Sequence, residues 1–460
     1  MSAADPPAGP RRVAAPATLE RGISLPQAVA TNVVTMVGIG PFLMIPFMVL
    51  AMDGPHIVYA WVVGALIALA DGLVYAHFGA ALPGSGGPYL YLREAYTPLG
   101  MGRLMAFTYV FQVILVAPLS VAGGAVGFAD YLRFYWTTMT PLQHDLAAGA
   151  VCIAVTALLY RDIRSVGRLT VAMLVMVLIT VGWVIAAGLF NFSMAQAFDF
   201  PPRALQPGRD LFAKVGAAAI LAMYSYGGYN QVCYIGEEIK DPARTMPRAI
   251  VISIVAVAAL YIVMSTVILG MMPWPEIGAS RTIASVFIGR AFRDPTAGHA
   301  AGLVMTALIL FVAAASLFTN VLGYSRVAFA AARDGNFFPV FARVHPTKHF
   351  PHVAVLTVGA VALPFCFFSL GQIVNWLMQV QILMVFVWQC AGVILLDRYR
   401  KDLPQPFRMW LYPLPAVVSF ALWLYIFFTG PRDGAVFSAG FLVAAWAAYF
   451  AFRRRVPPVA

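Results

Sequence analysis

Charged side chains are scarce in this sequence of 460 residues. Asp, Glu, Lys and Arg together make up 11% of the chain, whereas hydrophobic residues make up 61%. An ordinary soluble domain carries about 25% charged residues. A soluble fold could not bury so much apolar surface, so the composition excludes one and predicts a protein that lies in a membrane.

Cysteine is also rare, and its placement excludes two kinds of site. All the cysteines fall in or beside apolar segments, without the spacing that holds a metal ion or the framework of a disulfide-stabilised domain. We expect free, packed cysteines, no metal and no cofactor. The residues are Cys152, Cys233, Cys366 and Cys390.

The sequence lacks the motifs of a pump or an enzyme. It has no G-x-x-x-x-G-K-[ST] stretch to bind nucleotide phosphates, and no recognisable Ser-His-Asp or Cys-His arrangement. Glu237 and Glu238 form an acidic pair, but Lys240, Arg244 and Arg248 follow closely. We therefore expect the pair to form part of a gate or a charged loop network rather than a catalytic acid and base.

The apolar residues are arranged in twelve blocks. About 20 apolar residues span a bilayer as a helix, so we predict an all-α membrane protein with 12 transmembrane helices. The polar, Pro-rich arm at 1–22 is expected to be disordered, and the first block is too long for a signal peptide core. The predicted spans are 27–50, 56–82, 104–132, 145–160, 166–190, 212–235, 248–272, 299–330, 352–369, 372–396, 411–430 and 435–452.

The net charge of +11 follows from the topology of these spans rather than from nucleic-acid binding. With an even number of spans, 22 of the 30 Lys and Arg residues fall on the face that holds both termini, and 8 fall on the other. Cytoplasmic loops carry the excess of Lys and Arg. We therefore predict a multi-pass protein of the cytoplasmic (inner) membrane with both termini in the cytoplasm.

Two spans are interrupted by glycine. Residues 38–41 read GIGP in the first span, and residues 226–229 read YGGY toward the end of the sixth. Glycine and proline weaken a helix, and an opened backbone inside a bilayer must be satisfied internally or line a cavity. Such glycines can also simply allow close helix packing. Matched interruptions in two halves of a chain favour a transporter site between inverted repeats.

Four stretches, in order and at the appropriate spans, resemble the amino acid–polyamine–organocation superfamily. In motif they are closest to the L-type amino-acid transporters and related bacterial amino-acid permeases. The resemblance covers nearly the whole chain. The stretches are 37–42 (VGIGPF), 83–95 (PGSGGPYLYLREA), 226–230 (YGGYN) with 237–242 (EEIKDP) and 247–249 (PRA), and 325–326 (SR) with 332–335 (ARDG).

The resemblance implies two inverted five-helix repeats with broken helices 1 and 6, followed by two further helices. It implies substrates with an α-amino and a carboxylate group, or polyamines in some branches. The corresponding ranges are 1–22 for the arm, 23–190 for the first repeat, 205–396 for the second, 408–452 for the last two helices and 453–460 for a basic cytoplasmic tail.

The sequence departs from this family in two places. Many sodium-independent members carry a lysine in the fifth span, and Met173 occupies the matching position here. Eukaryotic L-type members pair with a glycoprotein through a cysteine between spans 3 and 4, but residues 137–145 contain no cysteine. We therefore expect no disulfide-linked heavy chain, and the coupling ion is left open.

The two breaks together predict a binding site for an α-amino acid. The new helix start in span 1 presents N–H groups and a positive dipole end, which suit a carboxylate. The carbonyls freed where span 6 unwinds suit an ammonium group, and Tyr224 matches an aromatic gate of the family. The predicted substrate-binding residues are Val37, Gly38, Ile39, Gly40, Gln112, Tyr224, Ser225, Tyr226, Gly227, Asn230 and Asn320.

Asp71 is an acidic residue past the middle of the second span. A carboxylate at that depth is costly unless it is paired, protonated or hydrated, and Tyr75 lies one turn further along the helix as a possible hydrogen-bond donor. Asp71 is therefore a candidate for proton coupling. The alternative is a hydrogen-bonded packing residue.

The most direct interpretation is a secondary transporter of neutral α-amino acids that works by proton symport or by exchange, as a monomer or a homodimer. A polyamine transporter of the same fold is the alternative, although only Asp71 offers an acidic group at depth. A sensor or scaffold with a transporter fold is a third, which the two intact interruptions disfavour.

Overall fold

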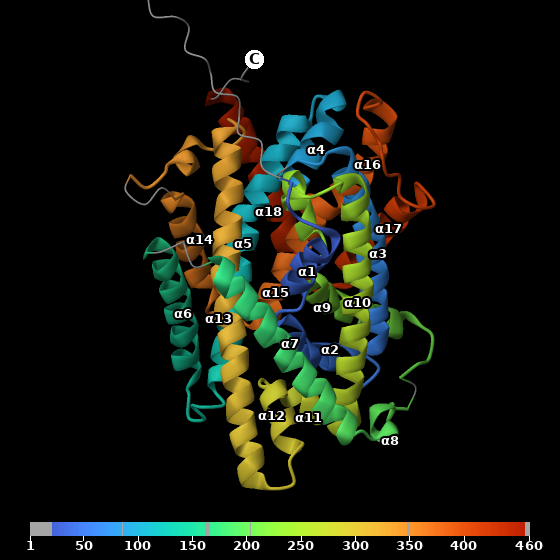
Figure 1. The fold of residues 1–460 in the computed structure, drawn as a ribbon, viewed down its shortest axis with the longest axis vertical. Coiled ribbons are helices and arrows are strands. Elements are labelled where there is room, and N and C mark those ends of the chain that lie inside the picture. Colours follow the sequence, from blue (N-terminus) through green and yellow to red (C-terminus); the bar gives the residue numbers. More distant parts are fainter. Residues whose placement is uncertain (1–20, 85, 162–165, 203, 347–349, 456–460) are drawn as a thin grey trace, which may run out of the picture.

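The computed structural model describes residues 21–84, 86–161, 166–202, 204–346 and 350–455. Within these ranges, the structure does not describe the side chains at 161, 166–174, 319, 322 and 454–455. The side chain of Met173 is one of these. The described chain is helical apart from its turns and loops (Figure 1).

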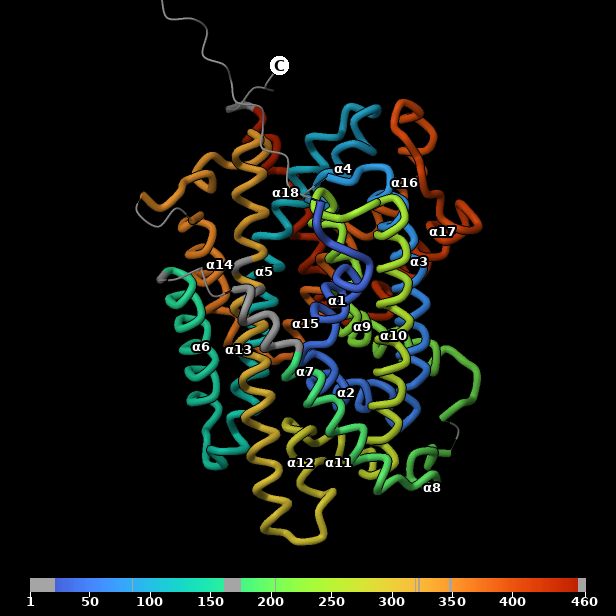
Figure 2. The backbone as a smooth tube through the Cα atoms, viewed as in Figure 1, coloured from blue at the N-terminus to red at the C-terminus, as the bar shows by residue number. Residues whose placement is uncertain are grey.

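Most of the long helices run along one axis and form a bundle, which residues 175–190 cross obliquely (Figures 1 and 2). Their bounds are α1 (Leu25–Met36), α2 (Gly40–Met52), α3 (Val58–Ala81), α5 (Gly102–Leu132), α6 (Pro141–Arg161), α7 (Val166–Phe190), α9 (Arg209–Tyr226), α10 (Pro242–Met271), α13 (Pro295–Arg333), α14 (His352–Phe365), α15 (Leu370–Gln381), α16 (Val387–Tyr399), α17 (Leu414–Thr429) and α18 (Arg432–Arg455).

Short helices cap the two ends of this bundle. At one end lie α4 (Pro88–Tyr96) and the turn Pro339–Ala342, and at the other lie α8 (Met194–Ala197), α11 (Trp274–Ala279) and α12 (Ile283–Arg290) (Figure 1). The chain enters α1 from the first end, and α18 finishes there as well. Arg93, Arg103 and Arg400 also lie at this end: Arg93 and Arg103 line one cavity, and Arg400 pairs with Glu94 of α4.

Seven of the described helices are long and apolar enough to cross a membrane, and α1 and α2 form an eighth, bent span. The shorter apolar helices Val175–Phe190, His352–Phe365 and Leu414–Thr429 add to these. Large apolar side chains are exposed on the outside of the bundle, as expected for a surface that faces lipid. Examples are Leu66, Ile153, Leu178, Val255 and Val304.

Each predicted span contains a helix, but several bounds were wrong. The sixth span was expected to be helical up to residue 235, but its helix, α9, ends at Tyr226. Only the short turns Gln231–Tyr234 and Gly236–Glu238 follow. The helix of the fourth span, α6, begins at Pro141 rather than residue 145. The helix of the eighth span, α13, extends over Pro295–Arg333. The tenth span is interrupted by one turn of π-helix at Ile382–Phe386, which the sequence did not signal.

Both glycine interruptions are breaks in the structure. The helix of the first span stops at Met36 and resumes at Gly40 with a bend of 50°. In the sixth span, Gly228 follows the end of α9 with a φ of +110°, a conformation that a residue with a side chain rarely adopts. A Cβ atom on Gly228 would lie 2.5 Å from Cγ2 of Thr35 in α1, so the two breaks are packed closely together.

Replacing Gly228 by alanine should therefore destabilise the folded protein. The added methyl group meets Thr35, and overpacking of this kind costs about 1–3 kcal/mol. We expect the thermal unfolding temperature of the purified protein in detergent to fall by several degrees. Gly149→Ala is the matched control, because a Cβ atom there has no heavy atom within 4 Å. Equal unfolding temperatures for the two variants would contradict the close approach at Gly228.

Candidate functional site at the two helix breaks

The two breaks meet in the interior of the bundle. A Cβ atom on Gly40, the first residue of α2, would lie 3.7 Å from Cα of Ser225 and 3.8 Å from Cε1 of Tyr224, both in the last turn of α9. These are ordinary contact distances, so the start of α2 lies against the end of α9 with space for no more than a methyl group between them. A Cβ atom on Gly38 would lie 3.6 Å from Oγ of Ser316 in α13.

Helix ends of opposite polarity converge at this point. The start of α2 contributes N–H groups that have no partner within that helix, and the ends of α1 and α9 contribute carbonyl groups that have left the helical hydrogen-bond pattern. The helix dipole adds partial positive charge at the former and partial negative charge at the latter. An arrangement of this kind fits a small zwitterion without any charged side chain.

Tyr261 of α10 joins the two breaks. Its hydroxyl group lies 2.7 Å from the carbonyl oxygen of Met36 and 3.0 Å from that of Ser225, and it donates to these two oxygens. The side chain is buried and packs against the rings of Trp61 and Tyr226. Nothing in the sequence singled out this tyrosine, because its partners lie 225 and 36 residues away along the chain.

Asn32 is a second residue that the sequence interpretation missed. From α1, its Oδ1 accepts a hydrogen bond of 2.9 Å from the backbone N–H of Val232, and its Nδ2 donates to Oγ of Ser253 at 3.2 Å. It thus holds the turn that follows the second break against α1 and α10. A fully buried asparagine inside an apolar span was the available signal.

Of the predicted binding residues, most lie at the breaks. Val37 and Ile39 are buried between α1 and α2, Ser225 and Tyr226 end α9, and Gly227 donates to the carbonyl oxygen of Tyr224 at 3.3 Å. The ring of Tyr224 reaches α5, where a Cβ atom on Gly123 would lie 3.8 Å from its hydroxyl oxygen.

The polar residues expected near the breaks do not all lie there. Asn320 of α13 donates to Oγ of Ser120 in α5 at 3.4 Å, one turn from Gly123. Gln112 is buried, and its Oε1 has no hydrogen-bond partner, but it precedes Gly123 by eleven residues, or about 16 Å along α5. Asn230 directly precedes the turn Gln231–Tyr234, where its carbonyl oxygen accepts a hydrogen bond of 2.9 Å from the N–H of Cys233.

Asp71 is fully buried in α3 and accepts hydrogen bonds from three other elements. Oδ2 lies 2.5 Å from the hydroxyl group of Tyr229, and Oδ1 lies 3.1 Å from Oγ of Ser419 and 3.1 Å from Nε1 of Trp423. The thiol of Cys390 is 3.7 Å from Oδ1. Tyr75, a possible donor from the sequence, is not among these donors to Asp71.

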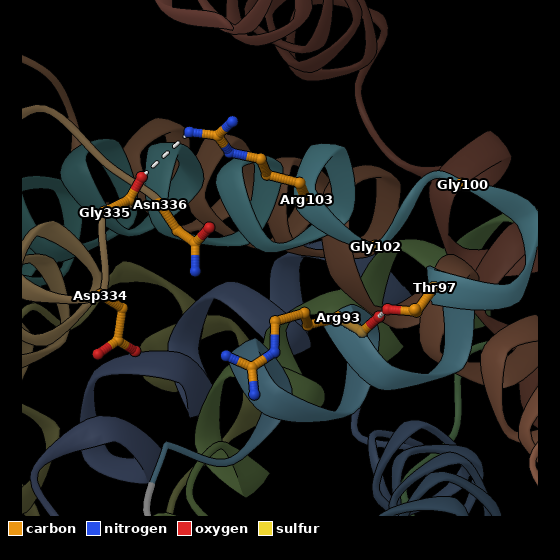
Figure 3. A pocket seen from close by; sticks show the side chains of 8 residues that line it. All are labelled: Arg93, Thr97, Gly100, Gly102, Arg103, Asp334, Gly335 and Asn336. Carbon is orange, nitrogen blue, oxygen red and sulfur yellow. Dashed lines mark hydrogen bonds between the residues drawn. The ribbon is translucent and has the colours of Figure 1, made fainter. Parts of the chain in front are cut away.

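The end of the bundle that carries α4 contains a separate cavity of about 400 Å³ (Figure 3). It lies where α4, the start of α5 and the loop after α13 meet, and Nη2 of Arg103 donates to the carbonyl oxygen of Gly335 at 3.2 Å. Tyr89 lies 3.2 Å from Oδ2 of Asp334 and accepts a hydrogen bond of 2.7 Å from Asn336. Two of the stretches that carry the family resemblance, 83–95 and 332–335, therefore contact each other.

The loop after the second break also forms hydrogen bonds with Gly22 and Ile23, just before α1. The carbonyl oxygen of Glu238 accepts hydrogen bonds of 3.0 Å from the N–H groups of Gly22 and Ile23, and Lys240 donates to Ile23 at 3.0 Å. Residues 1–20 of the expected disordered arm lie outside the described residues, but Gly22 at its end is bonded to this loop. The four cysteines are free and buried, as predicted.

The comparisons with known proteins agree with this architecture. The family described as amino acid permease matches residues 23–452. The chain belongs to the amino acid permease family. This permease is therefore a transport protein of the membrane and not an enzyme, and its family lies within the superfamily recognised from the sequence.

Several curated proteins resemble the permease over most of its length. The branched-chain amino acid permease BcaP of Bacillus subtilis is 28% identical over 81% of this chain and 82% of its own. The b(0,+)-type amino acid transporter 1 of Mus musculus is 24% identical over 95% and 88%. The mouse cationic amino acid transporter 4 is 27% identical over 84% of this chain, which spans only 61% of that relative.

Replacing Tyr261 by phenylalanine tests the link between the breaks. Two buried carbonyl oxygens then lose their shared donor, which costs about 1–3 kcal/mol. We expect a lower unfolding temperature and weaker equilibrium binding of labelled amino acid by the purified permease. Tyr135→Phe is the control, because its hydroxyl group makes the same kind of bond, to Leu303 at 2.6 Å, from an exposed side chain. Binding and stability that match those of the control would refute the link.

Proposed function

We propose that the permease transports neutral α-amino acids across the cytoplasmic membrane by alternating access between two inverted repeats, 23–190 and 205–396, with both termini in the cytoplasm. The observation that carries this proposal is the direct contact between the two breaks, Gly40 against Tyr224 and Ser225. A site formed by broken helices near the centre of a bundle is typical of secondary transporters.

The proposed binding mode uses the backbone. The substrate carboxylate binds the N–H groups of Ile39 and Gly40, next to Gly38, where the dipole of α2 is positive. The N–H group of Gly38 itself already donates to the carbonyl oxygen of Met36 at 3.0 Å. The ammonium group binds carbonyl oxygens in the last turn of α9, from Tyr224 to Tyr226. The oxygen of Ser225 already accepts from Tyr261, but a carbonyl oxygen has a second lone pair.

The surroundings of Tyr224 favour an apolar substrate side chain. A Cβ atom on Gly123 would have Ile373, Leu370 and Tyr224 as its nearest neighbours, at 3.4–3.8 Å. A branched-chain amino acid permease among the relatives supports the same class of substrate. The relatives give no support to the polyamine alternative.

The first experiment is uptake by purified permease in liposomes, with labelled leucine, valine, lysine, glutamate and putrescine. Leucine and valine are expected to enter in exchange for internal unlabelled substrate, while putrescine is not. Gly40→Ala should fold, because the new methyl group meets only ordinary contacts, but it narrows the space between the breaks and should raise KM at least tenfold. That factor corresponds to about 1.4 kcal/mol.

Gly440→Ala is the matched control for Gly40→Ala, because a Cβ atom at Gly440 has no heavy atom within 4 Å. Normal uptake by the Gly40 variant would place the substrate elsewhere. Uptake of none of the amino acids by the wild-type protein, with putrescine transported instead, would contradict the proposed substrate class. No uptake of any kind would favour a sensor or scaffold.

Asp71 is our candidate for proton coupling. If it carries the proton, an acidic exterior drives amino-acid accumulation by the wild-type permease, and Asp71→Asn abolishes that accumulation while exchange persists. Asparagine keeps an acceptor oxygen for Ser419 and Trp423 but cannot titrate. Asp53→Asn is the control, because that side chain is exposed on the surface. Gradient-driven accumulation by Asp71→Asn would exclude Asp71 from the proton path.

A further inference from the structure

Asp71 holds together helices that are far apart in sequence. Its carboxylate lies in α3, two of its donors lie in α17, and another follows the break at the end of α9. Within the described part of the chain, no Lys, Arg or His side chain forms an ion pair with it. Neutral donors alone therefore satisfy this buried carboxylate.

The two donors on α17 are arranged to bind one oxygen atom. Ser419 and Trp423 are four residues apart, so they lie on the same face of the helix, and both reach Oδ1 at 3.1 Å. The indole N–H of Trp423 can only donate a hydrogen bond, so its partner must be an acceptor. The ring of Trp423 is fully buried and stacks on Phe386, which fixes its orientation.

The other oxygen atom of Asp71 holds the second break. Tyr229 directly follows Gly228, whose positive φ turns the chain after α9, and the hydroxyl group of Tyr229 reaches Oδ2 at 2.5 Å. The side chain of Tyr229 is buried against Tyr75. Each partner that is lost leaves a buried oxygen atom of Asp71 less satisfied.

We propose that Asp71, Ser419 and Trp423 are positioning residues that tether Tyr229, and with it the unwound segment of the second break, to α17. The inference rests on the proposed use of that break for substrate binding. It gives α17, which lies outside the two repeats expected from the sequence, a direct role in shaping the site. The tether acts through Tyr229 and does not require Asp71 to exchange a proton.

The test removes the donors one at a time and leaves Asp71 in place. Trp423→Phe deletes the indole N–H and keeps an aromatic ring, Ser419→Ala deletes a hydroxyl group, and Tyr229→Phe deletes the other end of the tether. Each should weaken equilibrium binding of labelled leucine about tenfold, the effect of one lost buried hydrogen bond. Trp423→Phe combined with Tyr229→Phe should weaken it by less than the product, because both act through Asp71.

The thiol of Cys233 gives a local readout that does not depend on transport. This cysteine lies four residues after Tyr229 and is fully buried. Loss of the tether should speed its labelling by a maleimide several-fold, measured by peptide mass spectrometry, while Cys152 in α6 reacts as before. A purely structural effect of the substitutions would instead change the labelling of both cysteines together.

Two controls match the chemistry of the donors. Trp446→Phe removes a buried indole N–H that has no hydrogen-bond partner, and Ser438→Ala removes a buried hydroxyl group that bonds only Ala435 of its own helix, at 3.0 Å. Both variants should bind leucine as the wild type does, and their Cys233 should react with the maleimide at the wild-type rate. If Trp423→Phe and Ser419→Ala also behave as the wild type, the tether is refuted. If the wild type binds no amino acid, the proposed function fails, while Cys233 labelling still decides the tether.

Discussion

A broken helix inside a membrane must satisfy its own backbone, and the rest of this structure follows from that requirement. Water is not available in the bilayer core, so every N–H and carbonyl group released by a break needs a partner inside the protein or in a bound ligand. Here Tyr261 binds carbonyl oxygens at the ends of both α1 and α9, and Asn32 binds the backbone of the turn after α9. The groups left at the start of α2 are those that a carboxylate can satisfy.

This requirement explains why the supporting residues come from neighbouring helices. A break removes the local partners that an intact helix supplies, so the replacements have to reach in from packed helices such as α10 and α3. Tyr261, Asn32 and Asp71 are all buried, and each bonds residues more than 30 positions away in the chain. The positive φ at Gly228 and the bend between α1 and α2 are maintained because these side chains bind groups on both sides of the breaks.

The sequence predicted the breaks well because their signal is local. Glycine and proline within an apolar span indicate an interruption whatever surrounds them, and the helices do end at Met36 and Tyr226. It predicted Asp71 as an unusual residue for the same reason. It could not identify Tyr229, Ser419 and Trp423 as its donors, because a serine, a tryptophan or a tyrosine in an apolar span is unremarkable until the fold brings it to a carboxylate. Tyr75 was a possible donor from the sequence only because it lies one turn from Asp71 on the same helix.

A site built from backbone groups also separates the recognition of the substrate's common part from that of its variable part. The N–H and carbonyl groups of the breaks are the same for every sequence, so they suit the α-amino and carboxylate groups that all amino acids share. We propose that selectivity then depends on the side chains near Gly123, namely Tyr224, Leu370 and Ile373. Relatives named for branched-chain and for cationic amino acids within one family are consistent with this division. Helix α17 lies outside the repeats and acts through Asp71. It therefore positions the backbone groups that bind the α-amino and carboxylate groups, without altering the side chains that select the substrate.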